Sequence, residues 1–333
     1  MKTISVMLPC YNEEDNVRQI YEAVRDVIKN ELPGYNYEIL FADNKSKDRT
    51  REIIREICSK DKNVKAIFNV ANFGQFNSPY YAICQCTGDC VISMSADFQD
   101  PPEHIPKMVH EWEKGTRVVC MIKTSSKENK LMYFLRGRYY NLIHRMSNID
   151  QIKQFAGFCL FDKEFVKILA SLKDATPFIK GIISEYAPDR VEITYEQQKR
   201  KAGRSKNNFF SLYDAAMLSF TSYTKGGLRV ATFSGLIISF MSFMLALVYL
   251  IMKLVLWDEF IAGNAPMLIG MFFLGGIQLF FLGLLGEYVM SMNTRVINKP
   301  LVIEEERINM DTPKDILSVE RKDNGERYGG NKK

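Results

Sequence analysis

The chain has 333 residues, enough for one large domain and an appendage. Its formal net charge of +5 is a mild basic excess, which gives no reason to expect a nucleic-acid partner. Its seven cysteines are scattered without paired CxxC spacing, which favours reduced cytosolic thiols over a disulfide framework.

Residues 3–9 already form an apolar, strand-like run, so no secretory signal is expected. A helix with apolar residues at helical spacing should follow, and Asn12 or Asp15 could cap its start. Later strands are expected at 37–42, 64–68, 91–94 and 117–122, and helices at 50–58 and up to position 86. This alternation predicts an α/β fold with an open, mostly parallel, doubly wound sheet.

The fourth apolar run ends in small and acidic residues, and Pro101 and Pro102 prevent the strand from continuing. Asp97, Gln99 and Asp100 would then lie at the carboxyl end of a buried strand, the edge where open α/β sheets bind ligands. Their oxygens are the ligands that Mg²⁺ or Mn²⁺ prefers. The same spacing also fits a strand followed by an ordinary acidic turn.

Asp43 ends the second predicted strand, where an acid can accept a hydrogen bond from a ribose or a base. The other predicted strands also end in polar residues. A single acidic strand end is usually a helix cap, whereas several in succession favour a nucleotide-binding crevice.

Two long uncharged runs, 230–252 and 260–286, follow near the C-terminus. Each is long enough to span a hydrocarbon core of about 30 Å. Basic residues flank their outer ends, so the positive-inside rule places both chain termini in the cytoplasm. Two buried helices of a soluble protein are the alternative. Glycines along both runs would allow close packing within the hairpin or between copies of the chain.

Two other segments combine aromatic with polar or basic residues. Residues 207–223 fit an amphipathic helix at the membrane interface, near a lipid acceptor, and fit a core helix equally well. Residues 131–146 are a second basic and aromatic candidate. The chain after Ile308 is polar and charged, and its end is expected to be disordered.

Taken together, several motifs resemble those of family-2 glycosyltransferases. They are VMLPCYNEE at 6–14, ILFADNKSKDRT at 39–50, NFG at 72–74 and ADFQDPPE at 96–103. RKAGRSK at 200–206, GEY at 286–288 and KPL at 299–301 extend the resemblance to the polyisoprenyl-phosphate glycosyltransferases, such as dolichol-phosphate mannose synthase and bacterial undecaprenyl-phosphate glucosyltransferases.

This resemblance implies a GT-A-like domain that binds a nucleotide-diphosphate sugar, UDP-linked rather than GDP-linked, with Mg²⁺ or Mn²⁺. The hexose would pass to a polyprenyl phosphate with inversion. Asp97 and Gln99 would hold the metal, and catalysis would depend on Asp97, Arg200, Lys206 and Glu185. The donor-binding residues would be Pro9, Tyr11, Glu13, Asp43, Asp97, Lys123, Arg204 and Ser205.

Two departures from the family pattern matter. Ser95 replaces the first acid of the usual Asp-x-Asp, so a metal would be held more weakly. Gly157 replaces the acid expected at the acceptor, and Asp162 or Glu185 could substitute for it. A phosphate monoester has its second pKa near ~6, so a polyprenyl phosphate is largely dianionic at neutral pH and needs little deprotonation.

The chain is thus expected to comprise a cytoplasmic catalytic domain (1–206), a juxtamembrane helix (207–228), two transmembrane helices at about 230–252 and 265–287 within 229–292, and a cytoplasmic tail (293–333). It would lie in the plasma membrane, with a nucleotide-sugar, a polyprenyl phosphate and membrane lipid as partners. Further copies of the chain could also associate with it.

Two other functions fit parts of the sequence. A polysaccharide synthase would carry a Gln-x-x-Arg-Trp signature, which is absent, and two membrane helices make a poor polymer channel. A non-catalytic scaffold would fit the losses at Ser95 and Gly157, but Asp97, Gln99 and the basic loop at 200–206 argue against it.

Overall fold

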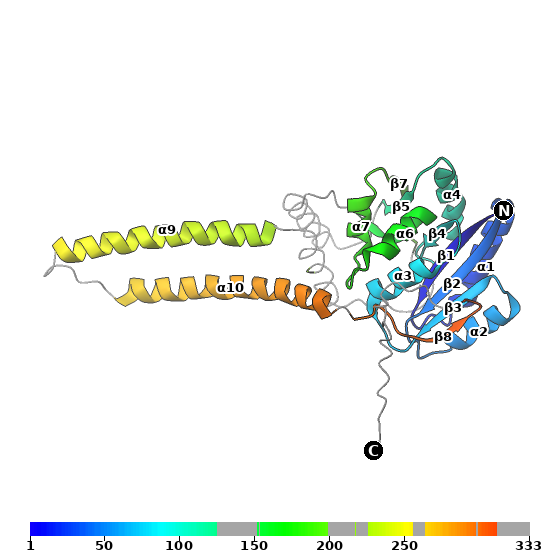
Figure 1. The fold of residues 1–333 in the computed structure, drawn as a ribbon, viewed down its shortest axis with the longest axis horizontal. Coiled ribbons are helices and arrows are strands. Elements are labelled where there is room, and N and C mark those ends of the chain that lie inside the picture. Colours follow the sequence, from blue (N-terminus) through cyan, green and yellow to red (C-terminus); the bar gives the residue numbers. More distant parts are fainter. Residues whose placement is uncertain are drawn as a thin grey trace, which may run out of the picture.

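The computed structural model describes residues 1–124, 152, 154–198, 217, 226–255, 264–297 and 299–311 (Figure 1). The first half contains β1 (Lys2–Cys10), α1 (Val17–Glu31), β2 (Tyr35–Asp43), α2 (Thr50–Lys60), β3 (Val64–Asn69), α3 (Gly74–Gln85), β4 (Cys90–Ser93), η1 (Pro102–His104), α4 (Ile105–Glu113) and β5 (Val118–Lys123). The second half contains β6 (Phe155–Asp162), α6 (Lys163–Leu172), α7 (Ile179–Tyr186), β7 (Val191–Tyr195), α9 (Gly226–Val255), α10 (Asn264–Ile297) and β8 (Glu304–Ile308). The strands and helices predicted from the sequence up to β5 are present, with bounds that differ by one or two residues.

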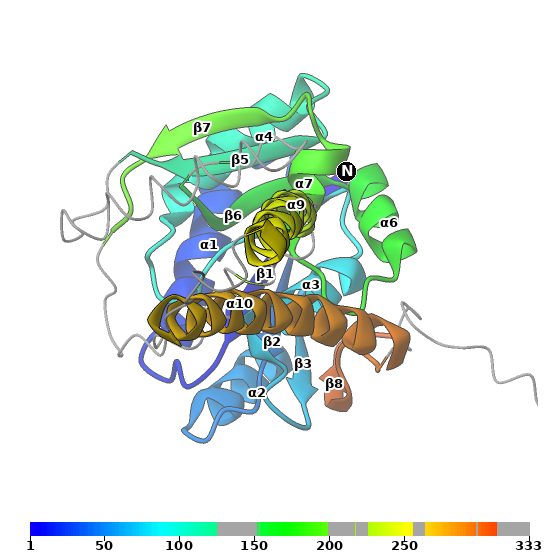
Figure 2. The ribbon, with the colours of Figure 1, turned by 90° about the vertical axis from the view of Figure 1, so that its left-hand side faces the viewer.

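The described strands form one eight-stranded sheet in the order β7-β5-β6-β4-β1-β2-β3-β8. The strands β4, β1, β2 and β3 are parallel, and β5 is parallel to β7. Two strands run the other way: β6 lies between β4 and β5, and β8 pairs with β3. Figure 2 shows β7 and β8 at the two ends of the sheet. The predicted open, mostly parallel sheet is confirmed, and its two antiparallel strands are a finding of the structure.

Two hydrophobic layers cover the sheet. The alternation along β1 sends Ile4, Val6 and Leu8 to one layer and Met7 to the other. Helices α1, α2 and α4 pack on the first face, and α3, α6 and α7 pack on the second. The buried residues of α1 are spaced three or four apart and form one stripe: Val17, Ile20, Val24 and Ile28.

The prediction that Asn12 or Asp15 caps α1 is wrong. The helix begins after Asn16 without a side-chain cap. Asn12 has a positive φ of 54° and turns toward the next loop instead, where its side chain accepts a hydrogen bond from Lys47 N at 2.7 Å. A partner from the loop after β2 therefore replaces the local capping bond.

The segment after the second apolar run is not merely a tail. Residues Glu304–Ile308 form β8, which closes the edge of the sheet at β3. Leu301 and Val302, just before it, are buried in the second hydrophobic layer. The α/β domain therefore includes residues beyond the predicted boundary at 206, and burial of Leu301 accounts for part of the KPL motif.

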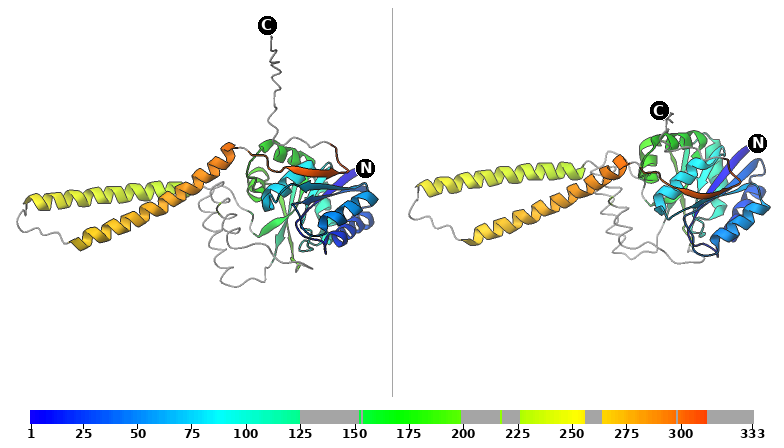
Figure 3. Two further views of the ribbon diagram at one scale, coloured as in Figure 1. Left: turned by 90° about the horizontal axis from the view of Figure 1, so that it is seen from below. Right: turned by 60° about the horizontal axis from the view of Figure 1, so that its bottom comes forward.

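Helix α9 contains the first predicted apolar run, and α10 contains the second from residue 264 onward; the two helices project side by side from the domain (Figures 1 and 3). Their 30 and 34 residues correspond to about 45 Å and about 51 Å of helix. Within the described residues, one stretch, Phe273–Ile297, is long and apolar enough to cross a membrane, and none of it is buried. The apolar stretch of α9, Thr232–Leu245, is shorter. Two membrane spans were predicted; by this length and hydropathy criterion, α10 qualifies among the described residues and α9 does not.

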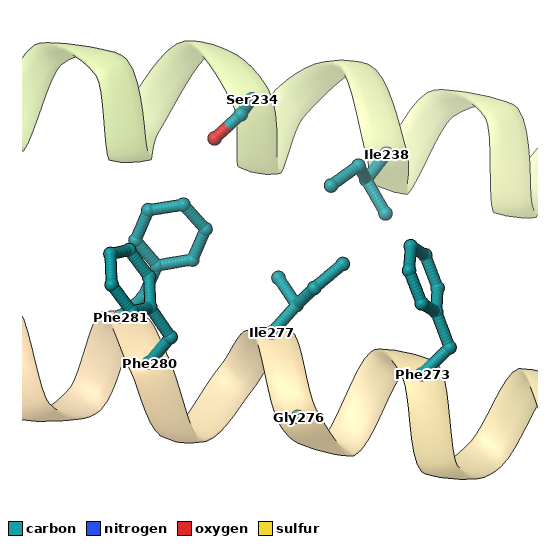
Figure 4. Close-up of a pocket in the computed structure, with 7 residues that line it drawn as sticks. All are labelled: Ser234, Ile238, Phe273, Gly276, Ile277, Phe280 and Phe281. Carbon is teal, nitrogen blue, oxygen red and sulfur yellow. The ribbon is translucent and has the colours of Figure 1, made fainter.

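The facing surfaces of the two helices are apolar. Figure 4 shows Phe273, Ile277 and Phe281 of α10 on the side facing Ser234 and Ile238 of α9. These side chains line a space of about 520 Å³ between the helices. The helices therefore do not pack tightly along this stretch.

Gly88, in the turn before β4, is required by close packing. A Cβ atom there would lie 2.4 Å from Ser5 Oγ and 2.7 Å from Thr3 O. We expect Gly88→Ala to lower the free energy of unfolding by about 1–3 kcal/mol, because the main chain of β1 cannot move away without disturbing the sheet. Gly34→Ala is the matched control, since its Cβ would meet nothing within 4 Å. Thermal unfolding in detergent would measure both, and equal midpoints would contradict this prediction.

Candidate active site

The candidate site lies at the carboxyl ends of β1, β2, β3 and β4. The parallel register places Cys10 opposite Asp43, and Asp43 opposite Phe68. In Figure 1 the N-terminus, where β1 begins, lies on the far side of the domain from α9 and α10. The carboxyl edge of the sheet therefore faces the side from which the apolar helices project.

The loops after β1 and β2 are tied together by hydrogen bonds. Asn12 N donates to Ser46 Oγ at 2.8 Å, and Glu13 N donates to Thr50 Oγ1 at 2.8 Å. Glu13 also accepts from Asn16 Nδ2 at 2.7 Å. Tyr11 and Glu13, both predicted to bind the donor, are thus half-buried on a loop whose path depends on its neighbour.

Asp43 is completely buried and already paired. Its Oδ2 atom accepts from Arg51 Nε at 2.5 Å, and both carboxylate oxygens accept from Ser46 N, at 3.2 Å and 3.3 Å. The carboxylate therefore anchors the loop that follows β2. Its predicted contact with a ribose or base stays a prediction.

The loop after β3 joins this arrangement through Asn44, which is not among the predicted site residues. Asn44 Nδ2 donates to Asn72 Oδ1 at 2.9 Å, and Asn44 Oδ1 accepts from Phe73 N at 2.9 Å. Asn69 Nδ2, at the end of β3, donates to Asn44 Oδ1 at 3.2 Å. Asn44 thus connects the NFG motif to the end of β2, a role that its place beside Asp43 in ILFADNKSKDRT could have signalled.

The loop after β4 is tightly turned. Asp97 is 4% exposed, and its Oδ1 atom accepts from Gln99 N at 3.1 Å. Phe98 between them has a φ of 62°, a left-handed conformation that is costly for a bulky residue. Such strain is maintained only where the surroundings fix it, and it is common at functional sites.

Asp100 serves the loop itself, contrary to the expectation that it would offer a free oxygen ligand. Its Oδ2 atom accepts from Ser95 N at 2.9 Å, and its Oδ1 atom accepts from Tyr195 Oη at 2.7 Å. Burial raises the pKa of Asp100, while the charge of Lys123 acts in the opposite direction. Both oxygens of Asp100 are therefore engaged within the protein.

A cavity of about 260 Å³ opens beside this loop. Its polar lining includes Ser95, Asp100 and Lys180, the last from the first turn of α7. The remaining lining residues come from β1, α3, the end of β4, β6 and α7: Pro9, Gln75, Phe76, Pro79, Ser93, Met94, Phe155, Ala156, Gly157, Phe178 and Ile179. Of the predicted donor residues, Pro9 therefore reaches the cavity. Lys180 belongs to no motif and was not predicted.

Gly157, where the family pattern has an acid, lies at this cavity. Its φ of 105° favours glycine, although a Cβ would meet nothing within 4 Å. The backbone conformation, not lack of space, therefore disfavours an aspartate here.

The two acids proposed to replace the missing one lie elsewhere. Asp162 is at the opposite end of β6, where it caps α6 through Glu164 N and accepts from Trp112 Nε1 at 2.8 Å. Glu185 is exposed on α7 and does not line the cavity. The prediction that Asp162 could replace the missing acid is therefore wrong. Glu185 does not contact the cavity.

The basic loop residues Arg200, Arg204, Ser205 and Lys206 lie outside the described residues, as do the segments 131–146 and, except for Met217, 207–223. The described chain approaches this loop at Gln198, whose N–H donates to Gln99 O at 3.3 Å. The main chain two residues before Arg200 is therefore bonded to Gln99, two residues after Asp97.

Comparisons with known proteins identify the family of the chain. Residues 5–169 match the family described as Glycosyl transferase family 2. The bactoprenol glucosyl transferase of Shigella phage SfX is 30% identical over 305 residues, which cover 91% of this chain and 99% of that protein. The SfII prophage-derived bactoprenol glucosyl transferase of Shigella flexneri is 30% identical over 301 residues, covering 90% and 96%. The chain belongs to glycosyltransferase family 2.

The predicted enzyme class, a glycosyltransferase, is thereby confirmed. Among solved structures, glucosyl-3-phosphoglycerate synthase from Mycobacterium tuberculosis, in complex with Mn²⁺, uridine diphosphate and phosphoglyceric acid, is 16% identical with a TM-score of 0.45. That similarity covers 66% of this chain and 76% of the synthase.

The residues around Asp97 in this family-2 glycosyltransferase fit a divalent cation held by one protein carboxylate. Mg²⁺ is commonly bound by one or two carboxylates together with substrate phosphates. Asp97 supplies one carboxylate, and Ser95 brings a hydroxyl to the same loop. Within the described part of the chain, no three His, Cys, Asp or Glu side chains are grouped as a metal site. Donor phosphate oxygens would therefore have to complete the coordination.

Asp100 should make stability depend on pH. Because burial raises its pKa, the folded protein binds this proton more tightly than the unfolded chain does. The resulting stabilisation is complete below the unfolded pKa, near ~3.9, and is lost as the pH rises through the raised folded value. Asn at this position keeps an acceptor for Ser95 N. We therefore expect Asp100→Asn to gain stability relative to the unaltered protein as the pH rises from about 4.

Thermal midpoints measured across pH would test this. Asp189→Asn, which alters an exposed acid before β7, is the control. Parallel pH profiles for the unaltered protein and Asp100→Asn would contradict the prediction.

Proposed function

We propose that this glycosyltransferase moves a hexose from a UDP-linked sugar to a polyprenyl phosphate at the cytoplasmic face of the plasma membrane, with inversion. The observation that carries the proposal is the cavity lined by Ser95 and Asp100 of the loop after β4, which has Lys180 on one wall and mostly apolar side chains around it. Full-length similarity to proteins named bactoprenol glucosyl transferases supports the lipid acceptor and the hexose.

Inversion follows from the chemistry of a single displacement. An oxygen of the acceptor phosphate forms a bond to the anomeric carbon, while the bond from that carbon to the donor diphosphate breaks. Among the described lining residues, the one carboxylate is Asp100, and both its oxygens are engaged. Since no other acid there could form a glycosyl-enzyme intermediate, direct attack by the acceptor is the simpler path.

The acceptor needs charge stabilisation more than a base. A phosphate monoester is mostly dianionic at neutral pH because its second pKa is about 6. Loss of an acid at Gly157 then removes a negative charge from the place where this dianion would bind. Lys180 offers a positive charge on the same cavity wall. Catalysis would accordingly depend on positioning and on electrostatic stabilisation.

The donor would lie along the carboxyl ends of β1, β2 and β4. Tyr11, Glu13 and Asp43 would face its nucleoside, and Asp97 would lie near its diphosphate. A divalent cation bound with the diphosphate would neutralise charge that develops on the leaving group. Asp97 and Gln99 would hold this cation, with a hydroxyl contribution from Ser95.

The basic loop at 200–206 would also act on the phosphates. Gln198 is bonded to the Asp97 loop, and two residues of extended chain span at most about 7 Å. Arg200, two residues after Gln198, would bind the diphosphate together with Arg204, Ser205 and Lys206. Lys123, at the end of β5, would add a further positive charge.

Membrane attachment through both α9 and α10 is part of the proposal. Their apolar side chains are largely exposed, which is costly in water and favourable in lipid. The carboxyl edge of the sheet faces these helices (Figure 1), which suits an acceptor whose phosphate lies at the membrane surface. The basic flanks would then keep both termini cytoplasmic. Association of copies through the helix pair also stays a prediction.

A donor screen would test the function. Purified protein in detergent would receive undecaprenyl phosphate and a panel of UDP- and GDP-linked sugars, with Mg²⁺, Mn²⁺ or EDTA, and mass spectrometry would detect lipid products. We expect one UDP-hexose to give a lipid-phosphate hexose, with product reduced in EDTA. Nucleotide binding without lipid product from any donor would contradict the proposed acceptor.

Asp97→Asn should lower turnover by about a hundredfold or more, the range seen when a group that stabilises transition-state charge is removed. It should also abolish any increase in UDP affinity on addition of Mn²⁺, measured by calorimetry. Asp189→Asn, at the opposite edge of the sheet, should change neither quantity. Unchanged turnover in Asp97→Asn would exclude this carboxylate from the mechanism.

A further inference from the structure

The strand that follows the second apolar helix reaches the proposed donor site. α10 ends at Ile297 and β8 begins at Glu304, so a connector of a few residues joins them. This connector is packed rather than loose: Leu301 is 2% exposed, and Val70 N donates to Ile303 O at 3.1 Å. β8 then pairs with β3, the strand next to β2.

Glu305, on β8, contacts Arg51 of α2, the residue that neutralises Asp43. Arg51 Nη1 donates to Glu305 Oε2 at 2.8 Å, Arg51 Nε donates to Asp43, and Arg51 Nη2 donates to Asn69 O at 2.6 Å. Its guanidinium carbon also lies 5.2 Å from the ring centre of Phe68. All three guanidinium nitrogens are thus engaged, and the side chain of Arg51 is 14% exposed.

Glu305 also holds the loop after β2 directly. Lys45 Nζ lies 2.8 Å from the same Oε2 atom. Lys45 has a φ of 66°, a left-handed conformation that is unfavourable for a lysine unless its surroundings fix it. This residue is two positions after Asp43, so the contact fixes the loop next to the buried carboxylate. The two cations lower the pKa of Glu305 to about 2, so it is ionised throughout the neutral range.

We propose that Glu305 is a positioning residue of the donor site, which acts through Arg51 and Lys45 to keep Asp43 and its loop in the arrangement that binds the nucleoside of a uridine diphosphate sugar. The proposal rests on the proposed function for the identity of the nucleotide. An isolated surface ion pair contributes little, but here one carboxylate joins two cations around a buried acid, and such networks are the exception.

The chain supplies a matched control. Glu306, the next residue on β8, pairs with Arg55 at 2.6 Å, and Arg55 lies one turn further along α2. Both pairs join β8 to α2 by the same chemistry, and both glutamates are about equally exposed, at 44% and 39%. Only the Glu305 pair connects to Asp43.

The experiment measures UDP affinity by calorimetry, donor KM, kcat and thermal midpoint for the full chain in detergent. We expect Glu305→Gln to weaken UDP binding and raise the donor KM by about tenfold, equivalent to about 1.4 kcal/mol, with kcat at saturating donor unchanged. Glu306→Gln should match the unaltered protein in UDP affinity. Both variants should change the thermal midpoint by the same small amount, because each loses one ion pair between β8 and α2. Glu305→Asp should recover part of the affinity, because it retains the charge.

The results distinguish the possible failures. Equal UDP affinity in Glu305→Gln and Glu306→Gln, whether retained or lost in both, would overturn the positioning role. If Glu305→Gln does not fold, Lys45→Gln tests the same contact from the loop side, and unchanged affinity there would overturn the role as well. If the unaltered protein binds no uridine nucleotide, the donor assignment in the proposed function fails, and this inference fails with it.

Discussion

The buried ion pair between Asp43 and Arg51 is the constraint on which the site depends. A carboxylate without solvent contact is tolerated only when a partner neutralises it, and Arg51 does so from α2. Because the same guanidinium reaches Asn69 O and Glu305, it fixes β3 and β8 relative to the end of β2. The loops after β1 and β3 then attach to this centre through Ser46 and Asn44. The edge that would receive the nucleoside is therefore shaped before any ligand binds.

In the loop after β4, Asp97 and Asp100 are three residues apart but make different contacts. Asp97 accepts from Gln99 N within the loop, whereas Asp100 accepts from Ser95 N and from Tyr195 Oη on β7. Burial and Asp100 together raise the pKa of Tyr195, so its hydroxyl keeps the proton that it donates. β7 is thereby joined to the Asp97 loop, and Gln198 continues this junction toward the basic loop. The contacts of each acid, rather than its residue type, therefore identify Asp100 as structural.

The strands and the site edge were predictable because each apolar run ends in polar residues where a parallel strand ends. Other features were not predictable from local pattern. Strand β8 pairs with β3 across more than two hundred residues of chain, and its charged sequence, EEERI, resembles a tail. The capping role expected of Asn12 failed because its side chain accepts from Lys47 N, on another loop. Lys180 lies in no motif, and folding alone brings it to the wall of the cavity.

The sequence by itself determined the order of strands and helices, the family motifs, the missing acids at Ser95 and Gly157, and the two apolar runs. Each of these depends on residue type and short spacing along the chain. The tertiary structure alone decided that Asp100 is engaged, that Asp162 is a cap at the wrong end of β6, and that Glu305 reaches Arg51. The physical reason is that desolvation and ion pairing depend on neighbours brought together by folding, and those neighbours lie far apart in the sequence.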